Sequence, residues 1–393
     1  MALPNPMRVA VLGAFPFPYP QGSQVFVAEH TRALVRSGVE AELFTYGSGV
    51  GEHPSDLNCI ATPGWLSPNT MRSGPTLAKF PADAGLLSTY IRRARVQPFD
   101  VAFAHNAEAA MIALAGRAVL KTPVIYVAHT ILRHELSAYG ADAIDFILAN
   151  LGGMVDRFIG RHADAIVALC NDAKRDLGSI ARGPVDVIAP GLDPTPSPTD
   201  EQVTRACAKF AITPGSYALY CGNLDAYQDL DLLAEAASIM GDDPTPNIVV
   251  ATHDKSTLPA SFEGVDNIAC VEVENFAQMR ALISGSQSVV LCRRRRGGFP
   301  IKLLNYMEAR KPIVAFEDIA SGFEHMTNAW LLDEKAEAGE LAAALRTLAH
   351  EPALRQTLGA GARELLETHH GWEQIAQRTC ALAESVLSQH SDQ

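Results

Sequence analysis

The sequence predicts an α/β protein with two domains, each built on a parallel β-sheet flanked by helices. Three observations support this prediction. The 393 residues exceed the length at which a single hydrophobic core keeps growing. Short apolar runs, typical of strands, alternate with helical patterns along the whole chain. A proline-rich segment from Pro190 to Pro198 interrupts this alternation near the middle of the chain.

The strand candidates of the first half are nearly continuous apolar runs, as expected for a parallel sheet that is covered on both faces. In order they are Arg8 to Leu12, Ala41 to Thr45, Val101 to Ala104, Val124 to Ala128, Ala165 to Leu169 and Val185 to Ile188. Helical patterns lie between them, among them Gln24 to Ser37, Glu108 to Leu120 and Ile144 to His162. This order is that of βαβ units with right-handed crossovers.

The second half repeats the alternation after the proline-rich segment, which we interpret as an interdomain hinge. Its strand candidates are Tyr217 to Cys221, Asn247 to Ala251, Asn267 to Val271, Ser288 to Cys292 and Pro312 to Phe316. We therefore expect two Rossmann-like domains facing each other across a cleft, at residues 1–190 and 191–371. The remaining residues, 372–393, form a helix that either caps the second domain or crosses back to the first.

Composition indicates a soluble globular protein, with 48% hydrophobic and 19% charged residues. No apolar run reaches the roughly 18 to 20 residues of a membrane span, and the first six residues do not resemble a signal segment. We therefore expect a cytoplasmic protein. A solvated helix face best explains the cluster Arg92, Arg93 and Arg95, and the alternative is a weak peripheral contact with the inner membrane face.

The formal net charge of −12 is unevenly distributed. Residues 1–190 hold 16 Lys and Arg against 16 Asp and Glu, and the rest of the chain holds 16 against 28. This distribution argues against a nucleic-acid partner. The seven cysteines form no C-x-x-C pair, and the pairs His369-His370 and His129…His134 have no cysteine or carboxylate partner at ligand spacing, so we predict no structural metal. We also expect no bound cofactor.

The most informative stretch is GFPIKLLNYMEARKPIV, from Gly298 to Val314. Its glycines permit close backbone approach, and Pro300 suits a first helical turn. Lys302 and Asn305 then project from the first turns of the helix. Together with the run Arg293 to Arg296 after a strand, this turn favours a phosphate ligand. The alternative is a structural strand–turn–helix connection whose arginines are merely solvated.

At this point the chain resembles the retaining family-4 glycosyltransferases, which have the two-domain GT-B fold and use nucleotide sugars. The resemblance rests on five segments in the family's order. They are a glycine-bearing loop running into a helix (Gly13 to Val25), VIYVAHT, the pair ADAIVALCNDAKRDL and VDVIAPGLD, YALYCGNLDAYQDLDLLAEA, and GFPIKLLNYMEARKPIVAF.

The sequence departs from the family pattern at four positions. Asn223 and Gln228 stand where the family usually carries arginine and lysine for the donor diphosphate. The family's paired glutamates fall on Gly297 and Asn305, so neither carboxylate is present. The chain is similar to a variant form of the family with a Pro-x-Lys-Leu donor turn. We expect Lys302 and the run Arg293 to Arg296 to restore the lost positive charge.

The resemblance implies a metal-independent hexosyltransferase whose donor site lies in the second domain. Its co-substrate is a nucleotide-diphosphate sugar, with UDP favoured over GDP. The implied catalytic residues are His129, near the reacting carbon, and Lys302, at the departing diphosphate. A core histidine without such a role is the alternative for His129. The implied donor-binding residues are Arg294, Arg295, Gly298, Phe299, Ile301, Asn305, Asn223 and Glu274.

The acceptor side has the weakest sequence signal, and a glycan, a lipid and a small molecule all remain open as acceptors. Gly22 and Ser23 precede a helix and form a candidate N-cap with free N–H groups. His105 ends a strand, and Glu135 follows His129 on what we expect to be a loop. Alternative functions are an inactive nucleotide-sugar-binding relative and a nucleotide-sugar epimerase, which needs a carboxylate dyad that the sequence does not place.

Overall fold

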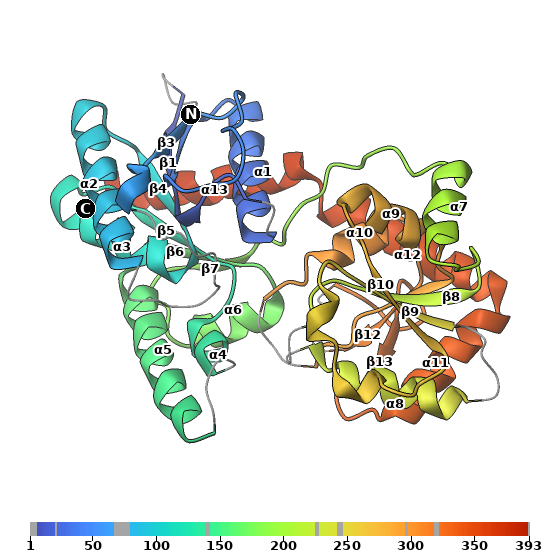
Figure 1. Cartoon of the computed structure of the whole chain (residues 1–393). Helices are drawn as coiled ribbons and strands as arrows, with labels where there is room; N and C mark the ends of the chain where they lie inside the picture. Colours follow the sequence, from blue (N-terminus) through green and yellow to red (C-terminus); the bar gives the residue numbers. More distant parts are fainter. Residues whose placement is uncertain are drawn as a thin grey trace. The chain divides into compact units, whose positions relative to one another are not determined.

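The computed structural model describes residues 6–19, 22–66, 79–137, 142–224, 228–241, 247–294, 298–317 and 322–391. The chain divides into two units, each with its own sheet and helices (Figure 1). Unit 1 comprises Met1–Gly191, Gly297–Phe299 and Gly371–Gln393, and unit 2 comprises Leu192–Arg296 and Pro300–His370.

Unit 1 contains a parallel sheet with seven strands in its described residues, in the order β3-β2-β1-β4-β5-β6-β7. The strands are β1 (Arg8–Pro16), β2 (Glu40–Tyr46), β3 (Cys59–Ala61), β4 (Val101–His105), β5 (Val124–Ala128), β6 (Ala165–Ala168) and β7 (Val185–Val187). The strand order reverses direction between β1 and β4, which pair in register from Val9 opposite Val101 to Gly13 opposite His105. Ligands of doubly wound sheets bind at the carboxyl ends of strands at such a point.

The helices of unit 1 pack on this sheet and on one another. They are α1 (Gly22–Arg36), α2 (Phe80–Val96), α3 (Asn106–Leu120), α4 (Leu132–Ser137), α5 (Asp142–His162), α6 (Asn171–Gly178) and α13 (Trp372–Ser391). The core that joins α2 and α3 to the sheet includes the fully buried Phe44, Tyr46 and Tyr90. The last helix of the chain, α13, packs on α1 in unit 1 (Figure 1).

Unit 2 has a parallel sheet with six strands in its described residues, in the order β10-β9-β8-β11-β12-β13. The strands are β8 (Tyr217–Cys221), β9 (Asn247–Thr252), β10 (Ile268–Glu272), β11 (Ser288–Val290), β12 (Ile313–Phe316) and β13 (Trp330–Leu332). The helices are α7 (Asp200–Lys209), α8 (Leu230–Met240), α9 (Phe276–Gly285), α10 (Lys302–Glu308), α11 (Ala338–His350) and α12 (Pro352–His369). The strand order reverses between β8 and β11.

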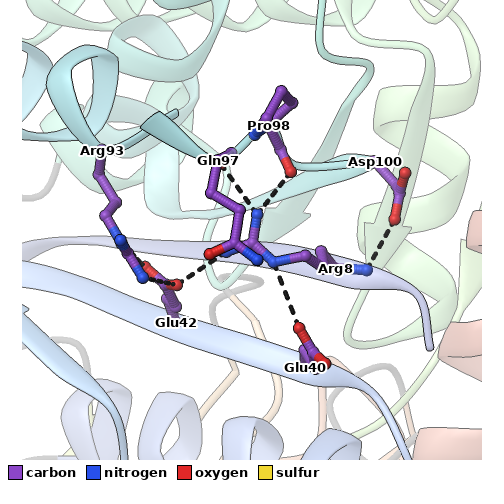
Figure 2. A network of polar contacts seen from close by, with 7 residues as sticks. All are labelled: Arg8, Glu40, Glu42, Arg93, Gln97, Pro98 and Asp100. Carbon is purple, nitrogen blue, oxygen red and sulfur yellow. Dashed lines mark hydrogen bonds and ion pairs between the residues drawn. The ribbon is translucent and has the colours of Figure 1, made fainter. Parts of the chain in front are cut away.

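A buried carboxylate fixes the amino-terminal edge of the unit 1 sheet (Figure 2). Glu42 of β2 accepts hydrogen bonds from Arg8 Nη2 at 2.9 Å and from Arg93 Nε and Nη2, both at 2.7 Å. Arg8 also donates to the backbone carbonyls of Gln97 and Pro98, and its backbone N–H donates to Asp100. This network joins β1, β2, α2 and the turn before β4 at the edge opposite the strand ends where ligands bind.

The structure confirms the predicted fold class, because both sheets are parallel and all eleven predicted strands are present. The sequence did not predict β3 and β13, which are three-residue strands at sheet edges. Arg93, expected on a solvated face, instead pairs with Glu42. In the part of the chain that the structure describes, no helix is long and apolar enough to cross a membrane.

The proline-rich segment is attached to unit 2 beyond its first residues. The backbone N–H of Leu192 donates to the carbonyl of His370 at 2.9 Å. Glu308 of α10 accepts from the backbone N–H and the hydroxyl of Thr195, at 2.7 and 2.9 Å. Arg280 of α9 donates to Glu308 and to the carbonyl of Pro196. Any hinge motion in this segment therefore has to occur outside the anchored residues or break these bonds.

Candidate functional site

Lys302 lies at the point of unit 2 where the strand order reverses. It is the first residue of α10, and its ammonium approaches the end of β8. Lys302 Nζ lies 3.2 Å from the hydroxyl of Tyr220 and 3.4 Å from Gln228 Oε1. The same ammonium lies 4.3 Å from the centre of the Tyr220 ring, within cation–π range. These contacts orient the ammonium of Lys302.

The turn that follows β8 is shaped around this ammonium. Gly222 has a φ of +134°, and a Cβ atom on it would lie 2.8 Å from Lys302 Nζ. The hydroxyl of Tyr220 donates to the carbonyl of Asn223 at 2.6 Å, and Gln228 Nε2 donates to Asn223 Oδ1 at 2.8 Å. Asn223 and Gln228 stand where the family pattern has two cations. Gln228 contacts Lys302, and Asn223 binds both Gln228 and Tyr220.

Two buried thiols near Lys302 stay protonated at neutral pH. Burial raises the pKa of Cys292 to about 12 and also raises that of Cys221, and the positive charge of Lys302 opposes both shifts. Neither thiol therefore carries a negative charge at neutral pH. A cation at a strand-order reversal is suited to an anionic ligand.

Arg294, predicted to bind the donor, makes contacts inside unit 2. Its Nε lies 2.8 Å from a carboxylate oxygen of Asp229, and Nη2 donates to the carbonyl of Ala336 at 2.6 Å. Its guanidinium also lies over the Phe316 ring, 4.9 Å from the centroid. Through these contacts Arg294 connects the start of α8 to the segment before α11. Arg295 lies outside the described residues.

The other predicted donor residues are not gathered around Lys302. Asn305 lines a small pocket with Ser197, Arg280 and Glu308, on the side of α10 that faces the proline-rich segment. Glu274 is exposed and pairs with Lys209 at 2.7 Å, and this contact lowers the pKa of its carboxyl group. Of the predicted donor residues Asn223, Asn305 and Glu274, only Asn223 therefore lies beside Lys302 and its partners Tyr220 and Gln228.

The turn before α10 divides between the two units. Gly298 and the buried Phe299 group with unit 1, and Ile301, which precedes α10, groups with unit 2. Gly298 has a φ of +91°, and a Cβ atom on it would collide with the backbone carbonyl of His129. A glycine is therefore required at this position on two grounds.

In unit 1, the predicted residues His105 and His129 are in direct contact. They follow or end adjacent strands, β4 and β5, at the carboxyl edge of the sheet. His105 Nδ1 lies 2.9 Å from His129 Nε2, and His105 Nε2 lies 3.2 Å from Nδ1 of a third histidine, His30 of α1. His30 Nε2 lies 3.3 Å from the hydroxyl of Thr379 on α13. All four side chains are buried.

The local structure of two predicted acceptor-side segments differs from expectation, and the acceptor role of their residues stays a prediction. Helix α1 begins at Gly22, so Gly22 and Ser23 lie in its first turn and neither is its N-cap. Glu135 lies in helix α4, where we expected a loop. This short helix is stabilised from outside, because the buried carboxylate of Asp156 accepts from the backbone N–H groups of Leu132 and Arg133. The side chain of Glu135 lies outside the described part of the chain.

Sequence reasoning missed His30, Thr379 and Tyr220. His30 occupies a core-facing position of α1, between the buried Val27 and Leu34, and a histidine on the apolar face of a helix is a usable signal for a buried polar contact. Thr379 is 349 residues away from His30 in sequence, so no spacing pattern could connect them.

In the described residues, no group of three His, Cys, Asp or Glu side chains is arranged to hold a metal ion.

Each of the two units matches a model of a known glycosyltransferase family. Residues 20–195 match the model described as Glycosyltransferase Family 4, and residues 215–351 match the model described as Glycosyl transferases group 1. The two matches cover most of both sheets in sequence order. The chain belongs to glycosyltransferase family 4.

Curated relatives include two proteins named D-inositol 3-phosphate glycosyltransferase. The protein from Mycolicibacterium paratuberculosis is 26% identical over 287 residues, which cover 68% of this chain and 63% of the relative. The protein from Mycobacterium avium is 25% identical over 287 residues, covering 68% of this chain and 65% of the relative. The chain thus spans less than two thirds of the length of the curated relatives that it matches.

Solved structures share the fold over nearly the whole chain. Sucrose-phosphate synthase from Thermosynechococcus elongatus superposes with a TM-score of 0.76 at 15% identity, covering 97% of this chain and 99% of that one. Anabaena HepE in complex with UDP superposes with a TM-score of 0.71 at 14% identity, covering 96% and 100%. These similarities identify the fold as GT-B.

Proposed function

We propose that this protein is a retaining glycosyltransferase that takes a sugar from a nucleotide-diphosphate donor, with UDP as the favoured nucleotide. Unit 2 is the donor domain and unit 1 the acceptor domain. The observation that carries the proposal is the ammonium of Lys302, held by Tyr220 and Gln228 at the strand-order reversal of unit 2. Family membership and the UDP complex of HepE support the same assignment.

The chemistry requires charge stabilisation at the leaving group. The bond between the anomeric carbon and the diphosphate oxygen breaks, and a new bond forms between that carbon and an acceptor hydroxyl oxygen on the same face of the sugar. The acceptor proton passes to the leaving phosphate oxygen. Lys302 offsets the negative charge that builds up on the diphosphate, as fixed cations do in preorganised sites.

The acceptor remains a glycan, a lipid or a small molecule.

The family's first carboxylate position falls on Gly297, outside the described residues, and its second falls on Asn305, which lines a different pocket. Donor binding therefore depends more on Lys302, and we propose that it requires no metal ion. Asn223 and Gln228 keep the cation in place instead of contributing charges of their own.

The test is calorimetric titration of the full chain with UDP, UDP-glucose and GDP, in EDTA and again with Mg²⁺. We expect Lys302→Met to weaken binding of the preferred nucleotide ten- to hundredfold, because a hydrogen bond to a charged group contributes about 1.5–3 kcal/mol. Lys174→Met, which removes an exposed lysine from α6, is the matched control and should bind normally.

Three outcomes count against the proposal. Equal weakening in both variants would show a nonspecific charge effect. Absence of binding by any nucleotide would remove the donor site. Binding without sugar transfer to any acceptor in a broad screen would favour the inactive nucleotide-sugar-binding alternative.

A further inference from the structure

Three histidines and a threonine form one continuous chain of polar contacts inside unit 1. The contacts run from Thr379 Oγ1 to His30 Nε2, from His30 Nδ1 to His105 Nε2, and from His105 Nδ1 to His129 Nε2. The distances are 3.3, 3.2 and 2.9 Å. The four residues come from α13, α1, the end of β4 and the residue after β5, so each was brought here by tertiary packing.

The surroundings keep the three imidazoles uncharged. His105 is fully buried, and His129 is the most exposed at 9%. Phe26 contacts all three rings, with centroids 5.0 to 5.8 Å apart, and the Trp372 ring lies tilted against Phe26 at 5.6 Å. Burial lowers the pKa of His30 to about 4 and that of His129 to about 3, and it lowers the pKa of His105 well below 6.5. Each ring at neutral pH therefore has one N–H group and one lone pair.

The hydroxyl of Thr379 decides which nitrogen of each ring carries the proton. Thr379 donates its proton to the backbone carbonyl of Ile375 at 2.8 Å, so its oxygen can only accept from His30. His30 must then carry its proton on Nε2 and accept at Nδ1 from His105. His105 in turn carries its proton on Nε2 and accepts at Nδ1 from His129. His129 is left with its proton on Nε2 and a lone pair on Nδ1.

We propose that Thr379, His30 and His105 form a positioning relay that holds His129 in the Nε2–H tautomer, with Nδ1 as a hydrogen-bond acceptor for a substrate hydroxyl. The inference rests on the proposed transferase function and assigns the group that this edge of unit 1 offers to the substrate. A hydroxyl that meets Nδ1 must donate, and this fixes its orientation. The three relay residues do not themselves touch substrate.

The opposite orientation of the relay is the competing state. If Thr379 donated to His30, every proton would move to Nδ1, and His129 would present an N–H donor. That orientation leaves Ile375 without the Thr379 hydroxyl bond and requires all three rings to change tautomer together. Removal of the Thr379 hydroxyl alone therefore tests the orientation of all three imidazoles. Thr379→Val keeps the shape of the side chain and removes the oxygen, and Thr379→Ser keeps the oxygen.

The experiment is long-range ¹H–¹⁵N correlation NMR of the histidine-labelled full chain at pH 7.5, with sugar-transfer kinetics in parallel. In the wild type and in Thr379→Ser we expect all three histidines as Nε2–H tautomers. In Thr379→Val we expect a second, Nδ1–H population at His129 and a fall in kcat by the same fraction, with the donor KM within twofold. Melting temperatures of the two variants within 3 °C of each other establish that both are folded.

Two results would overturn the relay. One is a wild-type spectrum with an Nδ1–H tautomer or an imidazolium at His30, His105 or His129. The other is a Thr379→Val protein whose His129 tautomer and kcat match those of Thr379→Ser. The tautomer spectrum needs no substrate, so it decides the relay even if no sugar transfer is found and the proposed function fails.

Discussion

Glu42 is the side chain whose loss should most clearly destabilise unit 1. Its side chain is 6% exposed and accepts three hydrogen bonds from Arg8 and Arg93. In Glu42→Gln the charge disappears, and the amide nitrogen replaces one of the two acceptor oxygens. That nitrogen is a donor facing another donor, so at least one of the three bonds is lost. Both guanidinium groups lose the charge of Glu42, although Arg8 keeps an ion pair with Glu40 at 3.3 Å.

The expected cost follows from the exposure of the two arginines. Removing one partner of a buried ion pair costs about 3–5 kcal/mol. Arg93 is 35% exposed and can regain water, whereas Arg8 is 13% exposed but keeps its bonds to the carbonyls of Gln97 and Pro98. We therefore expect the lower end, about 3 kcal/mol, which corresponds to a fall in melting temperature of roughly 6–12 °C for a unit of this size.

The assay is urea and thermal unfolding of the full chain, followed by circular dichroism and by the fluorescence of unit 1. The matched control is Glu201→Gln, which removes an exposed partner of Arg205 in α7 and should cost no more than about 0.5 kcal/mol. Nucleotide binding should stay unchanged in Glu42→Gln, because Glu42 lies at the amino-terminal edge of the other unit's sheet. Equal costs in the two variants would refute the reasoning from burial.

Three further predictions concern the sites. Gly222→Ala should displace the Lys302 ammonium and weaken nucleotide binding at least tenfold, as seen by calorimetry; unchanged affinity would contradict the tight turn. Glu308→Ala should lower the free energy of unfolding of unit 2 by about 3 kcal/mol, since Arg280 and the Thr195 N–H lose a buried acceptor, and a urea midpoint equal to wild type would disprove this. Because burial depresses the pKa of His30 to about 4, its contribution to stability is complete above pH 6.5 and is lost as the pH falls toward 4. His30→Asn should reduce the loss of stability between pH 7 and 4, of which His105 and His129 keep their share, and unfolding curves parallel to those of the wild type would argue against it.

The sequence was sufficient to predict most of the fold, for reasons that particular segments illustrate. Strands such as VIYVA and YALYC are continuous apolar runs, and only a sheet covered on both faces accommodates them. The edge strands β3 and β13 were not predicted, because three residues are too few to show a strand periodicity. Helix α4 was missed because it is six residues long and its capping carboxylate, Asp156, comes from another helix.

The candidate site was predicted only where a residue's place in a strand or turn fixes its position. Lys302 follows a glycine turn, and His105 and His129 end or follow strands, so their neighbourhood follows from topology. The donor-binding role of Arg294 was inferred from its charge and stays a prediction, whereas its bonds to Asp229 and Ala336 depend on loops whose course the sequence does not reveal.

The position of α13 has a consequence for how the protein is made. Trp372 is 2% exposed and packs against Phe26, so a helix that is translated after unit 2 completes the core of the first unit. Unit 1 cannot close during translation until unit 2 has been synthesised, although domains generally fold in order from the amino terminus. During that interval the α1 face, with Phe26 and His30, lacks its cover. Newly made chains should therefore depend on chaperones in proportion to the time needed to translate residues 192–370.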